Sequence, residues 1–253
     1  MLDIEVQREP GHRRNDIVRV DTEAEAVAYY MKFFTELAQP NRLFDSFRDA
    51  VPEKTPERAK IVGSLWYHLS EAIVDVLCLA LAKLENPRIR HFVVQTAYEE
   101  LGESSESKIH TDLLRDSLLV ADVDENDILA WSGYPDVRDA ITSLRDNLDA
   151  CTSDAEICGV LLGMELIAYE NIGNVVDYLS YSDEVARLVA ATEWVRLHNT
   201  LEEAHIERSV SIFVRYVTSY TARRKFVGKF IQVMHFWERF WASIARAATP
   251  AKA

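Results

Sequence analysis

The sequence predicts an all-α protein, and three observations support that prediction. Apolar residues recur at three- and four-residue intervals over most of the chain, as they do on one face of a helix. Sustained alternation of apolar and polar residues, which marks a half-buried strand, is missing, and so are Asn-Gly and Asp-Gly hairpin turns. The 253 residues include only 8 glycines and 7 prolines, which leaves few turns for a sheet-rich fold.

The first elements follow from local start and stop signals. Residues 1–21 are predicted to form an irregular N-terminal arm, and residues 22–248 one helical domain. Thr22 and Glu25 form a capping box that opens a helix to about residue 37, and a short helix follows over about 41–50. Pro56 at a first helical position starts a longer helix to about residue 84. Pro87 starts the next one, which Gly102 ends.

The remaining elements are also predicted to be helices. After a polar connector over 103–107, His110 lies in the first turns of a helix, and Asp136, Ser153 and Ser182 supply starts for later ones. The predicted ranges are 135–150, 153–181, 182–206, 209–220 and 222–247. We expect about seven core helices, with a polar pocket between the segments 87–102, 153–181 and 182–206.

Composition narrows the classes of function. The chain has 28 basic and 41 acidic residues and a net charge of −13, which argues against a nucleic-acid or anionic-membrane surface. Its three cysteines form no CxxC or zinc pattern, which fits a reducing cytoplasm. No signal peptide is visible, and the most apolar run, residues 72–84, contains Asp75 and Lys83. We therefore expect a soluble cytoplasmic protein with no membrane or nucleic-acid partner.

The most informative motif is His198-x-x-x-Glu202-x-x-His205. These positions are i, i+4 and i+7, which fall within a sector of about 60° on a helix. Imidazole and carboxylate ligands together suit iron, manganese or zinc. Core histidines bonded to nearby carboxylates are the alternative interpretation of the same pattern.

Other carboxylates and histidines could complete such a site. Glu100 ends one predicted helix and His110 begins the next, so two helices can each offer one ligand. Glu165 and Glu170 both interrupt an apolar run, where an unpaired carboxylate is costly. A dinuclear site in a helical bundle needs about six protein ligands, drawn from several helices.

Three segments carry a resemblance to a known family. Tyr98-Glu99-Glu100-Leu101-Gly102 with His110-x-x-Leu113, then Tyr169-Glu170, then His198-x-x-x-Glu202-x-x-His205 occur in that order. They resemble motifs of the haem-oxygenase-like di-iron oxidases, which share a fold with thiaminase-like and quinone-synthase-like proteins. The resemblance covers about residues 60–245 and implies a single haem-oxygenase-like helical bundle.

The resemblance also implies a cofactor and its ligands. It implies two iron ions, with O2 as co-substrate, bound by Glu100, His110, Glu170, His198, Glu202 and His205. Asp is usual in the family at the position of Glu202, and Glu165 is the alternative to Glu170. Glu71 or Asp75 could add a carboxylate ligand, and His68 could line a substrate pocket, although a bond from His68 to one of these carboxylates is favoured. Because the two metals would lie roughly 4 Å apart, His110 and His198 should be within about 12 Å of each other.

The function that follows is an O2-dependent oxygenase of a small nitrogen-bearing metabolite. N-oxygenation of an amine in a biosynthetic pathway is favoured, with an external electron donor, and a homodimer is left open. The alternatives are a di-iron oxidase that cleaves or desaturates carbon–carbon bonds, and a non-catalytic helical protein with a vestigial metal site. Thiaminase-like hydrolysis is disfavoured because the cysteines have no nucleophile context.

Overall fold

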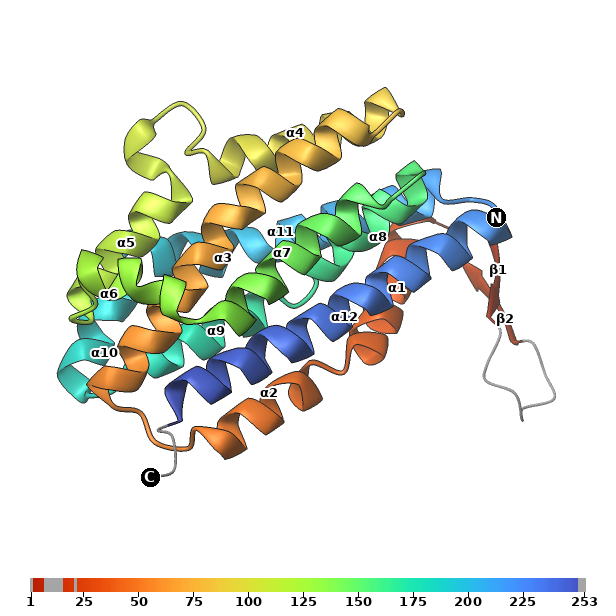
Figure 1. The fold of residues 1–253 in the computed structure, drawn as a ribbon. Helices are drawn as coiled ribbons and strands as arrows, with labels where there is room; N and C mark the ends of the chain where they lie inside the picture. Colours follow the sequence, from red (N-terminus) through yellow and green to blue (C-terminus); the bar gives the residue numbers. More distant parts are fainter. Residues whose placement is uncertain (1, 7–15, 21, 250–253) are drawn as a thin grey trace.

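The protein is built from α-helices and one short hairpin (Figure 1). The computed structural model describes residues 2–6, 16–20 and 22–249, with the side chains of residues 22–39, 44–130, 133–199 and 204–249. Its α-helices are α1 (Glu23–Ala38), α2 (Pro40–Ala50), α3 (Pro56–Lys83), α4 (Pro87–Glu100), α5 (His110–Val120), α6 (Glu125–Leu129), α7 (Pro135–Asp149), α8 (Asp154–Glu165), α9 (Ala168–Leu179), α10 (Asp183–Ala190), α11 (Glu193–Tyr216) and α12 (Tyr220–Ala248). Two short 3-10 helices, η1 (Glu106–Lys108) and η2 (Ala130–Gly133), lie in the connections.

Helix caps confirm several of the expected starts. Thr22 and Glu25 form the predicted capping box, in which each backbone N–H donates to the other residue's side chain. Thr55 accepts a hydrogen bond from the backbone of Arg58, with Pro56 at the first helical position. Gly102, just beyond α4, has a φ of 82°, a conformation that an L side chain would strain.

The aromatic residues of α12 form the centre of the core. The side chains of Trp237 and Trp241 are fully buried, and both rings lie nearly parallel to Trp66 of α3, with centroids 6.2 and 6.1 Å away. α12 packs against α8, α7, α2 and α3, and it crosses the front of the bundle in Figure 1. The aromatic residues of the run 235–241 therefore serve core packing.

Two glycines allow α8 to lie unusually close to α12. A Cβ atom on Gly159 would be 2.3 Å from the Phe226 carbonyl oxygen, and one on Gly163 would be 2.7 Å from Cβ of Val233. The indole N–H of Trp237 donates to the carbonyl of Gly163 at 3.0 Å. The position of α8, which carries Met164 and Glu165 at its end, is thus set by direct backbone contact with α12.

The N-terminal arm differs from the prediction of irregular chain. Strands β1 (Leu2–Val6) and β2 (Asp16–Val20) pair antiparallel, with Leu2 opposite Val20 and Ile4 opposite Val18. β1 alternates apolar and charged residues over only five positions, and β2 breaks the pattern with two adjacent apolar residues, Ile17 and Val18. Such a short alternation is easily overlooked, because pairing with the second strand rather than length stabilises it.

The helix boundaries differ from the prediction in two regions of the chain. The predicted 153–181 helix is interrupted at residues 166–167, between α8 and α9. The predicted 182–206 and 209–220 helices are instead α10 and a continuous α11, because the chain breaks near Thr192 and not near Ser209. Thr192 occupies the N-cap of α11, a position that threonine favours, whereas Ser209 is accommodated inside the helix.

By length and composition, α3 alone among the described helices could cross a membrane. In this structure α3 packs against other helices of the bundle, including α4, α9 and α12. Buried core helices have the same length and hydropathy.

Candidate metal centre

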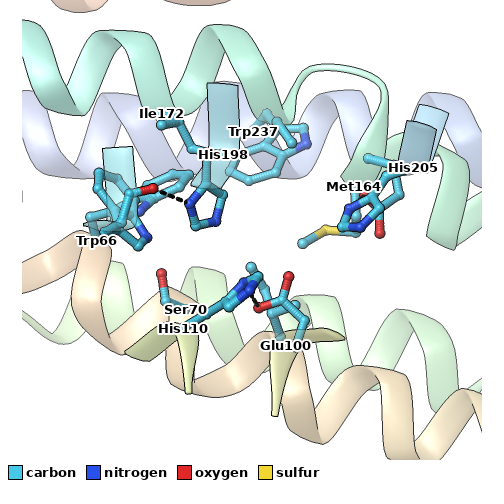
Figure 2. Close-up of a pocket in the computed structure, with 13 residues that line it drawn as sticks. Trp66, Ser70, Glu100, His110, Met164, Ile172, His198, His205 and Trp237 are labelled. Atoms are coloured by element: carbon cyan, nitrogen blue, oxygen red, sulfur yellow. Dashed lines mark hydrogen bonds and ion pairs between the residues drawn. The ribbon is translucent and has the colours of Figure 1, made fainter. Parts of the chain in front are cut away.

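A cavity of about 60 Å³ lies inside the bundle, where seven helices meet (Figure 2). It lies between the segments 87–102, 153–181 and 182–206, which were expected to surround a polar pocket. Its polar wall comes from α3, α4, α5, α8 and α11: Ser70, Glu100, His110, Glu165, His198 and His205. Its apolar wall is Trp66, Ile73, Met164, Ala168, Ile172, Trp194 and Trp237.

Glu100 and His110 are brought together by the turn after α4. Gly102 reverses the chain, so that the last residue of α4 faces the first residue of α5. Nδ1 of His110 lies 3.1 Å from Oε2 of Glu100 (Figure 2). This Nδ1 is buried and, within the described part of the chain, has no hydrogen-bond partner, because the contact with Glu100 lacks hydrogen-bond direction.

Glu100 carries its charge inside the protein. Burial alone would raise the pKa of this carboxyl, but His110 beside it, together with His198 and His205, outweighs burial and holds the pKa below its usual value. A largely buried, ionised carboxylate next to an imidazole nitrogen without a hydrogen bond is a donor pair that a metal ion would complete.

His198 presents one defined nitrogen to the cavity. Nδ1 of this ring lies 2.8 Å from the carbonyl oxygen of Trp194, one turn earlier on α11 (Figure 2). Burial lowers the pKa of His198 to about 4, so the ring is neutral at neutral pH. The single proton is therefore on Nδ1, where it donates to the carbonyl, and Nε2 keeps the lone pair that a metal ligand needs.

His110 and His198 satisfy the expected proximity. Their ring centroids are 5.0 Å apart, well inside the expected limit of about 12 Å. The ring of Trp194 is a second aromatic neighbour of His198, with centroids 4.9 Å apart. Two histidines of different helices thus lie side by side in the cavity wall.

His205 lies at the opposite end of the cavity, between two carboxylates. Its Nε2 is 2.9 Å from Oε2 of Glu99, and its Nδ1 is 3.4 Å from Oε2 of Glu165. The ring is almost completely buried, with 3% of the side chain exposed. His198 and His205 share one side of α11, as their spacing predicts, and Figure 2 shows both rings at the cavity.

Glu99 is charged and anchored from outside the cavity. Arg208 donates to both of its carboxylate oxygens, at 2.9 and 3.0 Å. Burial alone would raise the pKa of Glu99, but the hydrogen bonds and charge of Arg208, with a further contribution from His205, hold it below its usual value. The sequence motif implied Glu100 and not Glu99 as a ligand, and the structure puts Glu99 behind His205.

Glu165, not Glu170, lines the cavity. The sequence-based choice of Glu170 supposed one helix through 153–181, whereas the interruption after Glu165 changes the angular relation between the two residues. Glu170 is half-buried outside the cavity wall, and burial raises its pKa. A signal for Glu165 was present, since it directly follows the buried apolar run 157–164.

The possible extra ligands Glu71 and Asp75 and the possible pocket residue His68, all on α3, do not line the cavity. His68 bonds to Glu71 at 2.9 Å through Nδ1 and to the Ile128 carbonyl at 2.9 Å through Nε2, which is the structural role favoured over a pocket role. Glu71 is half-exposed, and Asp75 is 70% exposed and near Arg145. α3 presents Trp66, Ser70 and Ile73 to the cavity instead. These three residues lie on a different side of the helix from the other three.

The donor set suits iron, manganese or zinc. It offers imidazole nitrogens and carboxylate oxygens from α4, α5, α8 and α11 around one cavity. Among the residues whose side chains are described, no three His, Cys, Asp or Glu yet surround a common point. Glu202 lies on α11 between His198 and His205, but its side chain is outside the described residues. Metal binding by each of these residues stays a prediction.

A family comparison agrees with this donor set. A sequence model of the family described as iron-containing redox enzymes matches residues 64–238, which span every residue of the cavity wall. The chain belongs to the iron-containing redox enzymes. The matched region begins inside α3, so the N-terminal hairpin, α1 and α2 lie outside it.

Solved structures show that this iron-containing redox enzyme has the haem-oxygenase-like helical fold. A TenA homologue from Pseudomonas syringae pv. tomato str. DC3000 aligns with a TM-score of 0.65 and 13% identity over 90% of this chain and 98% of that chain. A CADD-like protein of unknown function from Nostoc punctiforme PCC 73102 aligns with a TM-score of 0.59 and 15% identity over 88% and 100%. No curated protein matches the sequence. At these identities the likeness establishes the fold alone.

Proposed function

We propose that this protein is a di-iron, O2-dependent oxygenase that oxidises the amine nitrogen of a small metabolite. The observation that supports it most is the convergence of Glu100, His110, Glu165, His198 and His205 on one buried cavity. The chain's membership of the iron-containing redox enzymes makes iron the metal to test first.

The protein residues would have distinct roles in such a centre. Glu100 with His110 would hold one metal position, and Glu165 with His205 the other, while His198 contributes Nε2 from the middle of the wall. When bound, the iron pair would supply the redox chemistry that activates O2. The tryptophans and Met164 around the polar groups would exclude bulk water and so strengthen the electrostatic interactions inside.

The cavity wall favours an uncharged or cationic amine over an anion. Within the described residues, its lining includes no Lys or Arg that could pair with a carboxylate or phosphate. Trp66, Trp194 and Trp237 contribute indole rings to the wall, and aromatic rings attract ammonium groups and pack on apolar ones. The net charge of −13 acts in the same direction, more weakly because field effects are local.

The overall reaction would be that of a monooxygenase. A primary amine, O2, two electrons and two protons give a hydroxylamine and water, and an external donor supplies the electrons. The amine lone pair would attack an oxygen atom, so the contribution of the protein is to orient that lone pair inside a dry site.

Metal content and product mass test this proposal in sequence. Anaerobic titration of the full-length protein should show two Fe(II) equivalents, and mixing with 18O2 and an amine panel should give a product with labelled oxygen on nitrogen. Failure to bind Fe(II) would favour a non-catalytic protein with a vestigial site. Loss of CO2, or turnover of fatty acids alone, would favour the carbon-oxidising alternative.

Glu165→Gln and Glu170→Gln form a matched pair for the third carboxylate. Both remove one negative charge from neighbouring turns, but only Glu165 lines the cavity. Glu165→Gln should weaken Fe(II) binding at one position or abolish it, and Glu170→Gln should bind as the wild type does. The reverse result would transfer the ligand role to Glu170.

A further inference from the structure

Four side chains connect α4 to α11 directly behind the candidate centre. Thr96 and Glu99 lie three residues apart on α4, and His205 and Arg208 lie three residues apart on α11. Arg208 donates to Oγ1 of Thr96 at 2.9 Å and to both oxygens of Glu99, and Glu99 contacts Nε2 of His205 at 2.9 Å. The result is a continuous chain of contacts from the outer part of the bundle to a cavity-lining imidazole.

Glu99 determines which nitrogen of His205 carries a proton. An ionised carboxylate can only accept hydrogen bonds, and Arg208 on both of its oxygens keeps Glu99 in that form. Nε2 of His205 must therefore be the N–H that donates to it. In the neutral ring this leaves the lone pair on Nδ1, which is the nitrogen that lies 3.4 Å from Glu165 at the cavity.

The two histidines of α11 are consequently oriented in opposite ways. His198 donates from Nδ1 to a carbonyl of its own helix, which leaves Nε2 for the cavity. His205 donates from Nε2 to a carboxylate of another helix, which leaves Nδ1. The orientation of His205 thus depends on the packing of α4 against α11, whereas that of His198 does not.

We propose that Glu99, held by Arg208, is a positioning residue that fixes the tautomer and the orientation of His205 so that Nδ1 faces the centre. Glu99 and Arg208 do not line the cavity, so they act through His205 and not on the substrate. The proposal rests on the proposed function only in taking a metal as the partner of Nδ1. Changes in groups that hold a ligating histidine typically weaken metal binding by about 10- to 100-fold.

The test begins with the metal-free, full-length protein, so that it does not depend on iron. Imidazole 15N shifts at pH 8 report which nitrogen of each histidine is protonated, and His205→Asn identifies the His205 signals by their loss. The wild type should show His205 with its proton on Nε2. A proton on Nδ1 alone, or on both nitrogens, would overturn the proposal.

Three variants then connect that tautomer to metal binding. Glu99→Gln should give mixed tautomers of His205 and Fe(II) binding about 10- to 100-fold weaker, because an amide cannot satisfy both Arg208 and His205. Arg208→Gln should have a smaller effect, since Glu99 still contacts His205. Glu103→Gln is the control: it removes the same charge from an exposed residue beyond α4 and should match the wild type in both measurements.

The outcomes separate this proposal from the proposed function. Wild-type tautomer and affinity in folded Glu99→Gln would refute the positioning role, whether or not the protein is an oxygenase. If the wild type binds no Fe(II), the proposed function fails, and the 15N spectra of the wild type and Glu99→Gln still decide the role of Glu99. If circular dichroism shows Glu99→Gln unfolded, Arg208→Gln replaces it, and an unchanged tautomer and affinity in that variant overturn the proposal.

Discussion

Gly159→Ala should destabilise the protein, although alanine is the better helix former. The added Cβ would lie 2.3 Å from the Phe226 carbonyl oxygen, whereas ordinary contact begins at 3.4 Å. The obstacle is backbone, so α8 and α12 would have to separate by about 1 Å at this crossing. Overpacking of this kind costs up to about 3 kcal/mol, and the helix propensity of alanine recovers about 1 kcal/mol, which leaves a net loss of about 2 kcal/mol.

Gly228→Ala is the matched control, because a Cβ there would meet nothing within 4 Å. It lies in the interior of α12 and should gain up to about 1 kcal/mol from helix propensity alone. In thermal unfolding followed by circular dichroism, the midpoint should fall by about 4 to 8 °C for Gly159→Ala and rise by about 2 to 4 °C for Gly228→Ala. Equal midpoints for the two variants would refute the close approach of α8 and α12.

Two further predictions concern the frame that holds the site. Burial alone would raise the pKa of Glu156, but hydrogen bonds from Thr152 and Ser153 and the charge of Lys225 lower it to about 2. The stabilisation that ionised Glu156 provides is therefore complete above its ordinary pKa of 4.5 and is lost as the pH falls from there towards 2. Glu156→Gln should flatten the acid limb of a plot of unfolding midpoint against pH. An unchanged acid limb would contradict this prediction. Trp241→Phe should lower the free energy of unfolding by about 1 to 3 kcal/mol, because it removes the indole donor 2.8 Å from Asn171 Oδ1 and leaves that buried oxygen unpaired. Urea unfolding would measure this change. A loss of less than about 0.5 kcal/mol would argue against the hydrogen bond.

Local signals predicted much of the fold and part of the site. The capping box at Thr22, the proline starts of α3 and α4 and the glycine after α4 each act within one turn of the chain, so they can be read from sequence. The spacing of His198 and His205 is equally local, and both line the cavity. A helix face needs only a regular helix, and α11 is continuous between the two residues.

Features that depend on tertiary contacts were missed. No proline or glycine occurs between Met164 and Ala168, so nothing local indicates that α8 ends at Glu165. α8 packs along α12, whereas α9 packs on α3. The chain changes direction between α8 and α9 because the two helices have different packing partners. The choice between Glu165 and Glu170 depended on that change. The link from Glu99 to Arg208 joins residues 109 positions apart, a distance over which sequence periodicity carries no information.

The central position of α12 has a consequence for synthesis on the ribosome. The chain completes α3, its most apolar long helix, at residue 83, whereas α12, which covers Trp66 on α3, starts at residue 220. At about 5 to 20 residues per second, roughly 7 to 27 seconds separate these events. Throughout that interval the surface of α3 around Trp66 lacks the α12 tryptophans that cover it in the complete fold. Chaperones that bind exposed apolar segments would meet this protein at α3, before the cavity has all of its walls.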